Sequence, residues 1–435
     1  MKSFAGIRGA AGAASLVCVL LAEPLAAQTA ADPALPGEVV IKLRTGADLA
    51  GVLASHRLSR IDQFGKRPIY RLRIDGGASV STKVSALRAD ARVEFAEPNF
   101  VAQTPEARRR NVVWAVGGSS SAAATQWASF SLRLAEAHAI SRGAGVRVAV
   151  LDTGVDTAHP ELIGRLDRGF DFVDFDTNPR EEGSTANPGF GHGTHVAGLV
   201  AQAAPQARIV PIRVLDAEGA GNLWVLAEAL LYAVDPDGDP ATDDGAHVIN
   251  LSVGTTRPTR LLNTAVELAT CSDDDENEAD DDYSDAGFKD DETRCNLRGG
   301  AVVVAAAGNS GSATERQYPA AEHAEGALAV TATAQGSRLA SFSNSGSWVQ
   351  IAAPGEHIVS TVPGGQWGVW SGTSLAAPLA AGVAALVRSA NPDWKPVDVT
   401  KRILERSAMV CGTALRQVDA LAAVHDFVPP DIACR

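Results

Sequence analysis

Short apolar runs alternate with helical patterns along the chain from about residue 126 onward. Runs rich in β-branched residues predict strands at 146–150, 209–214, 248–251, 302–306 and 328–332. Helical spacing of apolar residues predicts helices at 194–203, 223–233, 259–270 and 374–390. Apolar strands that alternate with helices predict an α/β fold with a doubly wound, mostly parallel sheet covered on both faces. Ligands of such sheets bind beyond the carboxyl ends of the strands, so reactive side chains are expected there.

A smaller α+β domain is predicted over residues 37–103. Alternating apolar and polar residues indicate strands at 38–43 and 69–74, a helix over 80–89 and an extended segment over 93–101. The segment that follows, 104–125, contains three consecutive arginines and then a run of glycine, serine and alanine. Such composition is typical of exposed linkers that proteases cut, so a domain boundary is expected there. The larger domain then spans 126–435.

Composition and charge exclude several classes of protein. The chain has 435 residues, of which 46% are hydrophobic and 20% charged, as in globular proteins of more than one small domain. Residues 271–295 contain twelve acidic and two basic side chains, and this window carries most of the net charge of -13. The sequence shows no basic stripe that would neutralise phosphates, so nucleic-acid binding is not expected.

The amino terminus and the cysteines predict export. Residues 1–27 contain a basic start, an apolar run and a small-residue end, the three parts of a secretory signal. The apolar run is shorter than the roughly 20 residues that span a membrane, so no membrane association is expected after signal removal. In a secreted or periplasmic protein the four remaining cysteines are expected to form disulfides. Among three possible pairings, proximity in sequence favours Cys271 with Cys295 and Cys411 with Cys434.

Four polar residues stand where the predicted strands end or the helices begin. Asp152 lies in an Asp-Thr-Gly sequence directly after the strand at 146–150, and Asn309 follows the strand at 302–306. His192 is flanked by glycines at the start of one helix, and Ser374 is at the start of another. Each residue alone is explained equally well as a helix cap or a turn residue. Together they supply the four groups that acyl transfer requires.

In that chemistry each group has a separate role. Ser374 is a poor nucleophile until His192 takes its proton, and Asp152 holds the imidazole in one tautomer and stabilises the imidazolium. The amide of Asn309 and a backbone N–H of Ser374 would bind the negatively charged oxygen that develops on the substrate carbonyl. The helix that starts at Ser374 adds partial positive charge at its amino end.

Three other catalytic classes fit the residues less well. Aspartic proteases need a second Asp-Thr-Gly, which this chain lacks. In α/β-hydrolases the order is serine, acid, histidine, and glycine occupies the position that is Ala376 here. A zinc site at His192 and His195 would need a glutamate between them and a third ligand, and neither is indicated. His195 is therefore expected to pack on the inner face of its helix.

At these residues the sequence resembles the subtilisin-like serine proteases. It has their Asp-Thr-Gly, His-Gly-Thr-His and Gly-Thr-Ser-x-Ala-x-Pro motifs in the family order, and the resemblance runs from about 126 to 428. It implies a serine endopeptidase that is made as a zymogen, with 37–103 as its inhibitory propeptide and a self-cleavage site within 104–125. The implied partners are protein or peptide substrates and the chain's own propeptide, and no cofactor is required.

The resemblance also implies a substrate cleft. An extended peptide would add as a strand between two edge segments, which are Gly219, Ala220 and Gly221 on one side and Ser252, Val253 and Gly254 on the other. Val253 would line one side of the main specificity pocket together with Ala306, Ala307 and Gly308. None of these side chains is charged, so cleavage after apolar or uncharged residues is expected.

The sequence departs from the family pattern at three places. Leu375 replaces the usual methionine, a change that conserves volume. The loop that builds a tight calcium site in many relatives is missing after the helix at 194–203. The acidic window at 271–295 is an insertion, expected to be a solvated loop, with calcium binding as its alternative. Residues 235–240 also resemble a calcium loop, but Pro240 stands where an EF-hand loop needs glycine.

Two functional alternatives remain beside peptide hydrolysis. A catalytically silent protein that binds partners through its acidic loop is disfavoured, because all four expected catalytic positions are intact. Peptide ligation through the same acyl-enzyme uses the same nucleophile, so the sequence does not separate it from hydrolysis.

Overall fold

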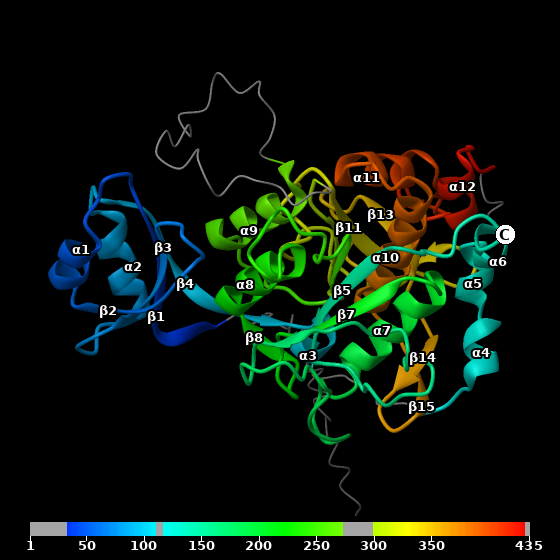
Figure 1. Cartoon of the computed structure of the whole chain (residues 1–435), viewed down its shortest axis with the longest axis horizontal. Helices are drawn as coiled ribbons and strands as arrows, with labels where there is room; N and C mark the ends of the chain where they lie inside the picture. The colour runs from blue at the N-terminus through cyan, green and yellow to red at the C-terminus, as the bar shows by residue number, and fades with distance from the viewer. Residues whose placement is uncertain (1–32, 110–115, 273–298, 431–435) are drawn as a thin grey trace, which may run out of the picture. The chain divides into compact units, whose positions relative to one another are not determined.

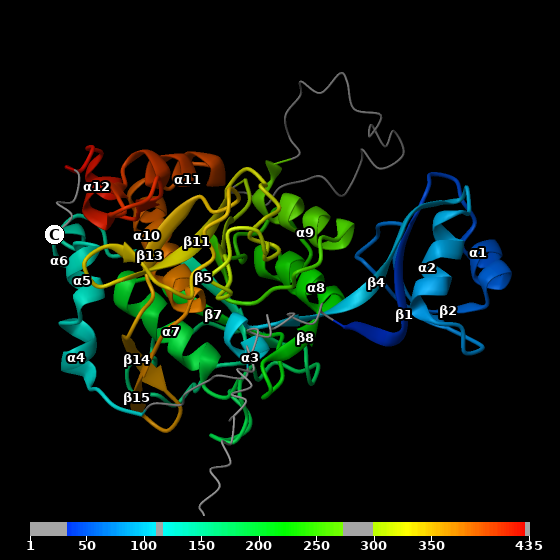
Figure 2. The same ribbon diagram turned by 180° about the vertical axis from the view of Figure 1, so that it is seen from behind.

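The computed structural model describes residues 33–109, 116–272 and 299–430. The expected signal segment, most of the acidic window, and the residues Cys295 and Cys434 of the two expected disulfides lie outside the described residues. Figures 1 and 2 show the described elements from opposite sides.

A mostly parallel sheet forms the centre of the larger domain, as the sequence predicted. All pairs from β17 to β6 are parallel, whereas β16 and β12 pair antiparallel with β17 and β11. The strands of this sheet, in spatial order, are β16 (Ala408–Met409), β17 (Arg416–Gln417), β13 (Ile351–Pro354), β11 (Ala327–Ala334), β10 (Val302–Ala306), β9 (Val248–Leu251), β5 (Arg147–Asp152), β7 (Arg208–Arg213) and β6 (Phe170–Asp171), with β12 (Arg338–Leu339) beside β11.

Helices cover both faces of this sheet because successive strand residues point to opposite sides. Val148 and Val150 of β5 belong to the core that contains α7 (His192–Ala203) and α10 (Thr373–Ala390). Their neighbours Ala149 and Leu151 belong to the opposite core. That core contains α8 (Leu223–Val234) and α9 (Arg260–Thr270). The doubly wound fold is therefore confirmed.

Small residues let α7 and α10 pack closely under the site. A Cβ atom on Gly382 of α10 would lie 2.3 Å from the Cβ of Ala203 at the end of α7. By length and hydropathy α10 could cross a membrane, but 89% of it is buried inside the protein, as in a core helix. The two helices begin at His192 and Thr373, so His192 and Ser374 both lie in first helical turns.

The N-terminal domain is an antiparallel sheet with two helices packed on one face. The sheet order is β2-β3-β1-β4-β8, in which β8 (Ala220–Asn222) belongs to the larger domain. The sequence predicted neither the first helix nor the second strand, because neither has a clean apolar period. The elements of this domain are β1 (Ala34–Leu43), α1 (Leu49–His56), β2 (Leu58–Gln63), β3 (Ile69–Ile74), α2 (Val80–Arg88) and β4 (Val93–Gln103).

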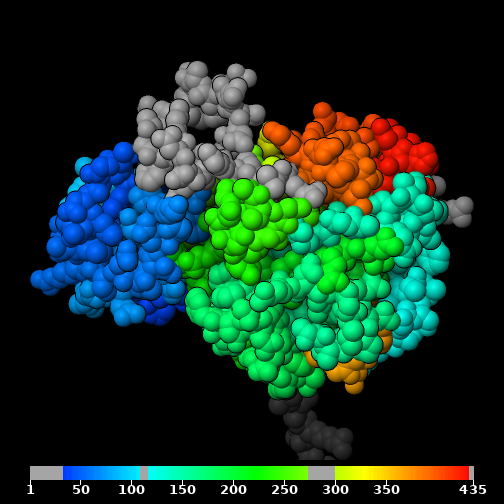
Figure 3. Space-filling view, in the orientation of Figure 1, coloured from blue at the N-terminus to red at the C-terminus, as the bar shows by residue number. Residues whose placement is uncertain are grey.

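Shorter elements complete the described chain. The hairpin of β14 and β15 packs beside α7, and α11 and α12 form a continuous orange and red surface in Figure 3. The bounds of these elements are α3 (Pro105–Arg109), α4 (Ser120–Ala124), α5 (Trp127–Ser131), α6 (Leu134–Ala137), β14 (Ile358–Val362), β15 (Gln366–Trp370), α11 (Pro396–Glu405) and α12 (Ala420–His425).

Candidate active site

A buried carboxylate and a buried imidazole meet where β5 ends and α7 begins. Asp152 is the last residue of β5 and His192 is the first residue of α7. The Nδ1 atom of His192 lies 2.7 Å from Asp152 Oδ1, which also accepts a hydrogen bond of 2.8 Å from the Thr153 N–H. This contact assigns the proton to Nδ1 and turns Nε2 toward the site.

Glycines on both sides of His192 permit this approach. Gly191 has φ of 87°, in the left-handed region that glycine adopts without strain. A Cβ atom on Gly193 would lie 2.1 Å from the Gly154 carbonyl oxygen and 3.1 Å from Asp152 Cβ. The glycines of the motif are therefore required for the carboxylate and the imidazole to meet.

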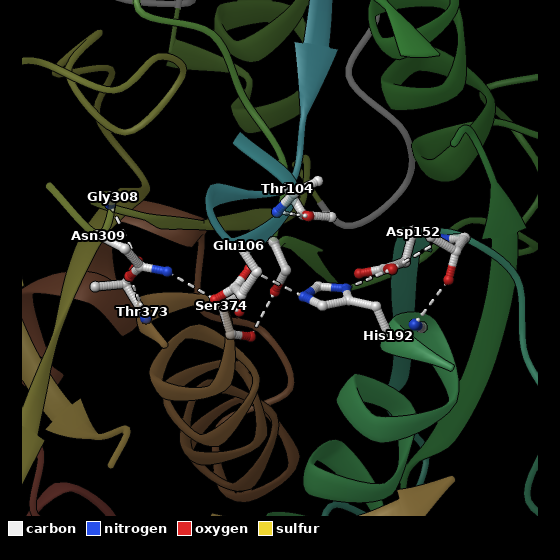
Figure 4. Close-up of polar contacts among 12 residues, drawn as sticks. Thr104, Glu106, Asp152, His192, Gly308, Asn309, Thr373 and Ser374 are labelled. Atoms are coloured by element: carbon white, nitrogen blue, oxygen red, sulfur yellow. Dashed lines mark hydrogen bonds and ion pairs between the residues drawn. The ribbon is translucent and has the colours of Figure 1, made fainter. Parts of the chain in front are cut away.

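The side-chain amide of Asn309 is held in one orientation. Its Oδ1 atom accepts hydrogen bonds from both the N–H and the hydroxyl of Thr373, each 2.8 Å long. The Thr373 hydroxyl in turn accepts a hydrogen bond of 3.1 Å from the Gly308 N–H. Because Oδ1 is occupied on this side, the Nδ2 group points into the site beside Ser374 (Figure 4).

A glutamate from α3 lies among these groups, and the sequence analysis did not identify it. Glu106 Oε1 accepts hydrogen bonds from the Ser374 hydroxyl and, at 2.7 Å, from Asn309 Nδ2. Its Oε2 atom lies 3.3 Å from His192 Nε2 (Figure 4). One carboxylate therefore contacts the hydroxyl, the amide and the imidazole together.

Charge in this cluster shifts two pKa values. Burial opposes the charge on both partners, but hydrogen bonds and attraction to His192 hold the pKa of Glu106 below its usual value. Burial likewise disfavours the imidazolium, yet the charges of Asp152 and Glu106 raise the pKa of His192 to about 10. In this state His192 is an imidazolium at neutral pH and does not accept a proton.

The chain that leads to Glu106 lies between the two predicted substrate-binding segments. β4 pairs antiparallel with β8, with Ala102 opposite Gly221 and Gln103 opposite Ala220. Gln103 also exchanges two backbone hydrogen bonds with Gly254, of 2.9 and 3.0 Å. The Thr104 N–H then donates to the Gly219 carbonyl at 3.1 Å. The structure therefore brings both predicted edge segments against one extended strand of the same chain.

The start of the predicted linker at 104–125 is buried and helical in the structure, whereas an exposed segment was expected. Thr104 is buried, and its hydroxyl accepts a hydrogen bond of 3.1 Å from the Ala107 N–H at the start of α3. Pro105 at the first helical position fits this helix start. The Thr-Pro-Glu sequence could have predicted a helix, but it carries no signal that Glu106 contacts residues more than 80 positions away. The stretch 110–115 lies outside the described residues.

The remaining predicted site residues lie at the same strand ends. The Ser252 hydroxyl donates a hydrogen bond of 2.7 Å to the Ser374 carbonyl, which ties the end of β9 to α10. The side chains of Val253, Ala306 and Ala307 are buried in the cores beside the site. Their part in specificity stays a prediction.

His195 packs in the core, as the sequence predicted. Its ring stacks on Trp370 with centroids 4.6 Å apart and an interplanar angle of 5°. Burial and the neighbouring charge of His192 lower its pKa to about 3, so the ring stays neutral. The ring thus stacks on one face, and its Nε2 atom lies 3.3 Å from the Gly368 carbonyl oxygen.

One acidic cluster among the described residues offers oxygen ligands of the kind that calcium prefers. Carboxylate oxygens of Asp235, Asp237 and Asp244 lie within 4.8 Å of one another. Burial and the neighbouring acids raise the pKa of Asp235. The Thr242 hydroxyl lies 3.2 Å from carboxylate oxygens of both Asp237 and Asp244. Calcium binding at this loop stays a prediction.

A parallel α/β sheet that joins carboxylate, imidazole and hydroxyl in this chain order defines the class of subtilisin-like hydrolases. Residues 143–425 match the model of the subtilase family, and the chain belongs to this family of serine proteases. Residues 22–99 match the model of the fervidolysin N-terminal prodomain. The predicted family and enzyme class are therefore confirmed.

Curated relatives and solved structures agree with this assignment. A thermophilic serine proteinase of Bacillus sp. (strain AK1) is 35% identical over 346 residues, which cover 77% of this chain and 72% of the relative. Thermitase of Thermoactinomyces vulgaris is 37% identical over 61% of this chain and 82% of its own length. The crystal structure of fervidolysin from Fervidobacterium pennivorans shares the fold, with a TM-score of 0.66 and 22% identity, over 91% of this chain and 62% of that chain.

Proposed function

We propose that this protein is a secreted serine endopeptidase that cleaves peptide bonds through Asp152, His192 and Ser374. The observation that carries the proposal is the carboxylate of Glu106, which the hydroxyl of Ser374, the amide of Asn309 and the imidazole of His192 contact together. The three groups therefore face one small region, where a nucleophile, its base and an oxyanion donor must lie together for acyl transfer.

The reaction follows from the roles of these groups once Glu106 has left. His192 Nε2 takes the proton of Ser374 as Oγ attacks the carbonyl carbon, and Asp152 stabilises the imidazolium. Asn309 Nδ2 and the Ser374 N–H at the start of α10 donate to the oxyanion. His192 then gives its proton to the leaving amine, which yields the acyl-enzyme, and water releases the acid by the reverse sequence of proton transfers.

We extend the proposal to a zymogen in which the N-terminal domain inhibits the enzyme. β4 fills the cleft as a substrate strand would, through its ladder with β8 and its two hydrogen bonds to Gly254. After Thr104 the chain turns into α3, so a side-chain carboxylate and not a peptide carbonyl faces Ser374. A side chain offers no peptide bond, so Glu106 must withdraw before the chain cuts itself within 104–125.

Export, disulfides and pocket preference complete the proposal. The signal-like residues 1–27 support secretion to the periplasm or the medium. Export supports disulfides that join Cys271 to Cys295 and Cys411 to Cys434. The uncharged side chains of Val253, Ala306 and Ala307 support cleavage after apolar or uncharged residues. A peptide-library profile dominated by lysine, arginine or acidic residues at that position would contradict this preference.

Labelling with a fluorophosphonate probe tests the proposed nucleophile. We expect the full-length chain to process itself and then to label, and Ser374→Ala to do neither. Ser371→Ala is the matched control, because Ser371 lies just before α10 and its hydroxyl accepts a hydrogen bond of 2.9 Å from the His357 N–H. Labelling or self-cleavage that persists in Ser374→Ala would require a different nucleophile and would overturn the proposal.

A further inference from the structure

A second carboxylate lies directly behind the Asp152–His192 pair, and the mechanism above does not use it. Glu181 belongs to the loop between β6 and α7 and is partly buried. Its Oε1 atom accepts a hydrogen bond of 2.8 Å from the Thr153 hydroxyl. Its Oε2 atom accepts hydrogen bonds from the Thr194 hydroxyl at 2.9 Å and from the Thr194 N–H at 3.2 Å. One carboxylate therefore links two different chain segments.

The two linked threonines stand next to the reacting residues. Thr153 directly follows Asp152, at the end of β5, and Thr194 is two residues after His192, in the first turn of α7. The Thr153 hydroxyl also accepts a hydrogen bond of 2.9 Å from the Gly193 N–H. These contacts close a network that fixes the end of a strand relative to the start of a helix.

The backbone holds Glu181 firmly in this place. Its N–H donates to the Val155 carbonyl at 3.2 Å, and the Val155 N–H donates to the Pro179 carbonyl at 3.0 Å. A Cβ atom on Gly154 would lie 2.4 Å from the Arg180 carbonyl oxygen, so the loop rests directly on the Asp-Thr-Gly turn. Removal of the carboxylate would therefore leave the loop in place while releasing the two threonine side chains.

Glu181 is not an ordinary solvated carboxyl group, because burial and hydrogen bonds act on its pKa in opposite directions. Burial and the charge of Asp152 raise the pKa of Glu181 to about 7. The hydrogen bonds from both threonines and the amino end of α7 oppose this shift and favour the ionised form. A surface carboxylate would have none of these contacts.

We propose that Glu181 is a positioning residue that aligns Asp152 with His192 by binding Thr153 and Thr194. The inference rests on the proposed function, because it concerns the alignment of the proposed base. It assigns Glu181 no contact with substrate. Proton transfer depends steeply on geometry, and a misplacement of about 1 Å can cost about 100-fold in rate. The expected cost of losing Glu181 is therefore a lower kcat with little change in KM.

Steady-state kinetics of the processed enzyme, normalised to fluorophosphonate-labelled sites, test this role. For Glu181→Ala we expect kcat to fall about 10- to 100-fold, with KM within about twofold of wild type. Glu181→Gln keeps one acceptor oxygen and should recover part of the lost rate. Glu182→Gln is the matched control, since the neighbouring Glu182 pairs with Arg180 and Arg213 and is expected to leave kcat unchanged.

The outcomes separate this inference from the proposed function. An unchanged kcat per labelled site in Glu181→Ala, with only a lower melting temperature, would show a purely structural role and overturn the inference. If Glu181→Ala does not fold, Thr194→Val and Glu181→Gln carry the same test, and normal kcat in both would overturn it. Activity that survives Ser374→Ala would instead overturn the proposed function, whatever the result for Glu181→Ala.

Discussion

The side-chain amide of Asn309 donates a hydrogen bond of 2.7 Å to Glu106, a residue 203 positions earlier in the chain. The acceptor is a carboxylate oxygen that the Ser374 hydroxyl also contacts. A negatively charged oxygen in this position shares its charge and the Asn309 donor with the oxyanion of the proposed reaction. The contact between Asn309 and Glu106 therefore shows one donor that the proposed reaction would use.

Replacement of Glu106 should weaken inhibition. Charge-assisted hydrogen bonds contribute about 1.5–3 kcal/mol each, and Glu106→Ala removes two of them as well as the contact with His192. We expect full-length Glu106→Ala to process itself at least about tenfold faster than wild type, measured by gel time course. Glu94→Gln, which breaks a pair with Lys42 on the N-terminal sheet, is the control. Equal processing rates in all three proteins would show that the carboxylate does not inhibit.

Loss of the Asn309 amide should slow chemistry more than binding. Removal of one oxyanion donor costs about 10²–10³ in kcat in subtilisin, and this known value is carried over to the processed Asn309→Ala enzyme. KM should change little, because the donor acts on charge that exists only in the transition state. Equal kcat values for Asn309→Ala and wild type, measured with the same peptide ester and amide, would remove Asn309 from the mechanism.

The pairing of His192 with two carboxylates should make the inhibited form depend on pH. The pKa of His192 is about 10 in the folded protein and about 6.5 in the unfolded chain. The imidazolium therefore contributes fully to the free energy of unfolding below pH 6.5, and this contribution is lost as pH rises through 10. We expect the melting temperature of the Ser374→Ala chain to exceed that of Ser374→Ala/Glu106→Gln near pH 6. The difference should shrink steadily toward pH 10. A constant difference across this range would contradict the raised pKa.

Substitution of Gly193 should misalign Asp152 and His192 and so lower the activity. The added Cβ of Gly193→Ala would meet the Gly154 carbonyl and approach Asp152, so the contact between Asp152 and His192 must open. We expect a loss of activity of at least about 100-fold. Gly117→Ala is the control, because no atom lies within 4 Å of the Cβ it would add. Full activity of Gly193→Ala would show that the pair tolerates displacement.

The sequence predicted the parallel sheet, and it placed the four candidate groups at strand ends and helix starts. The apolar runs around Val148 and Val304 are continuous because both faces of the sheet are buried, and this pattern is typical of parallel strands. Glycine-rich turns after such strands then limit where reactive side chains can stand. These local signals predicted the positions of Asp152 and Asn309 before any tertiary contact was known.

Local sequence patterns did not predict the contacts of Glu106 and Glu181. Glu106 follows a threonine and a proline that predict only a helix start, and it precedes arginines that suggest a solvated linker. Glu181 lies in a loop that lacks apolar periodicity. In both cases the partners are distant in sequence, so the contact depends on how segments fold together and leaves no trace in composition or spacing.

Strand β4 belongs to the sheet of the N-terminal domain and also pairs with β8 at the edge of the larger domain. Its two ladders share the same backbone, so opening the cleft and unfolding the small sheet are mechanically coupled events. If the protein is the proposed zymogen, the lifetime of its inhibited form depends on a domain that contains neither the proposed nucleophile nor the proposed base. A change of solvent or temperature, or cleavage by another protease, would then activate the enzyme by destabilising the N-terminal domain.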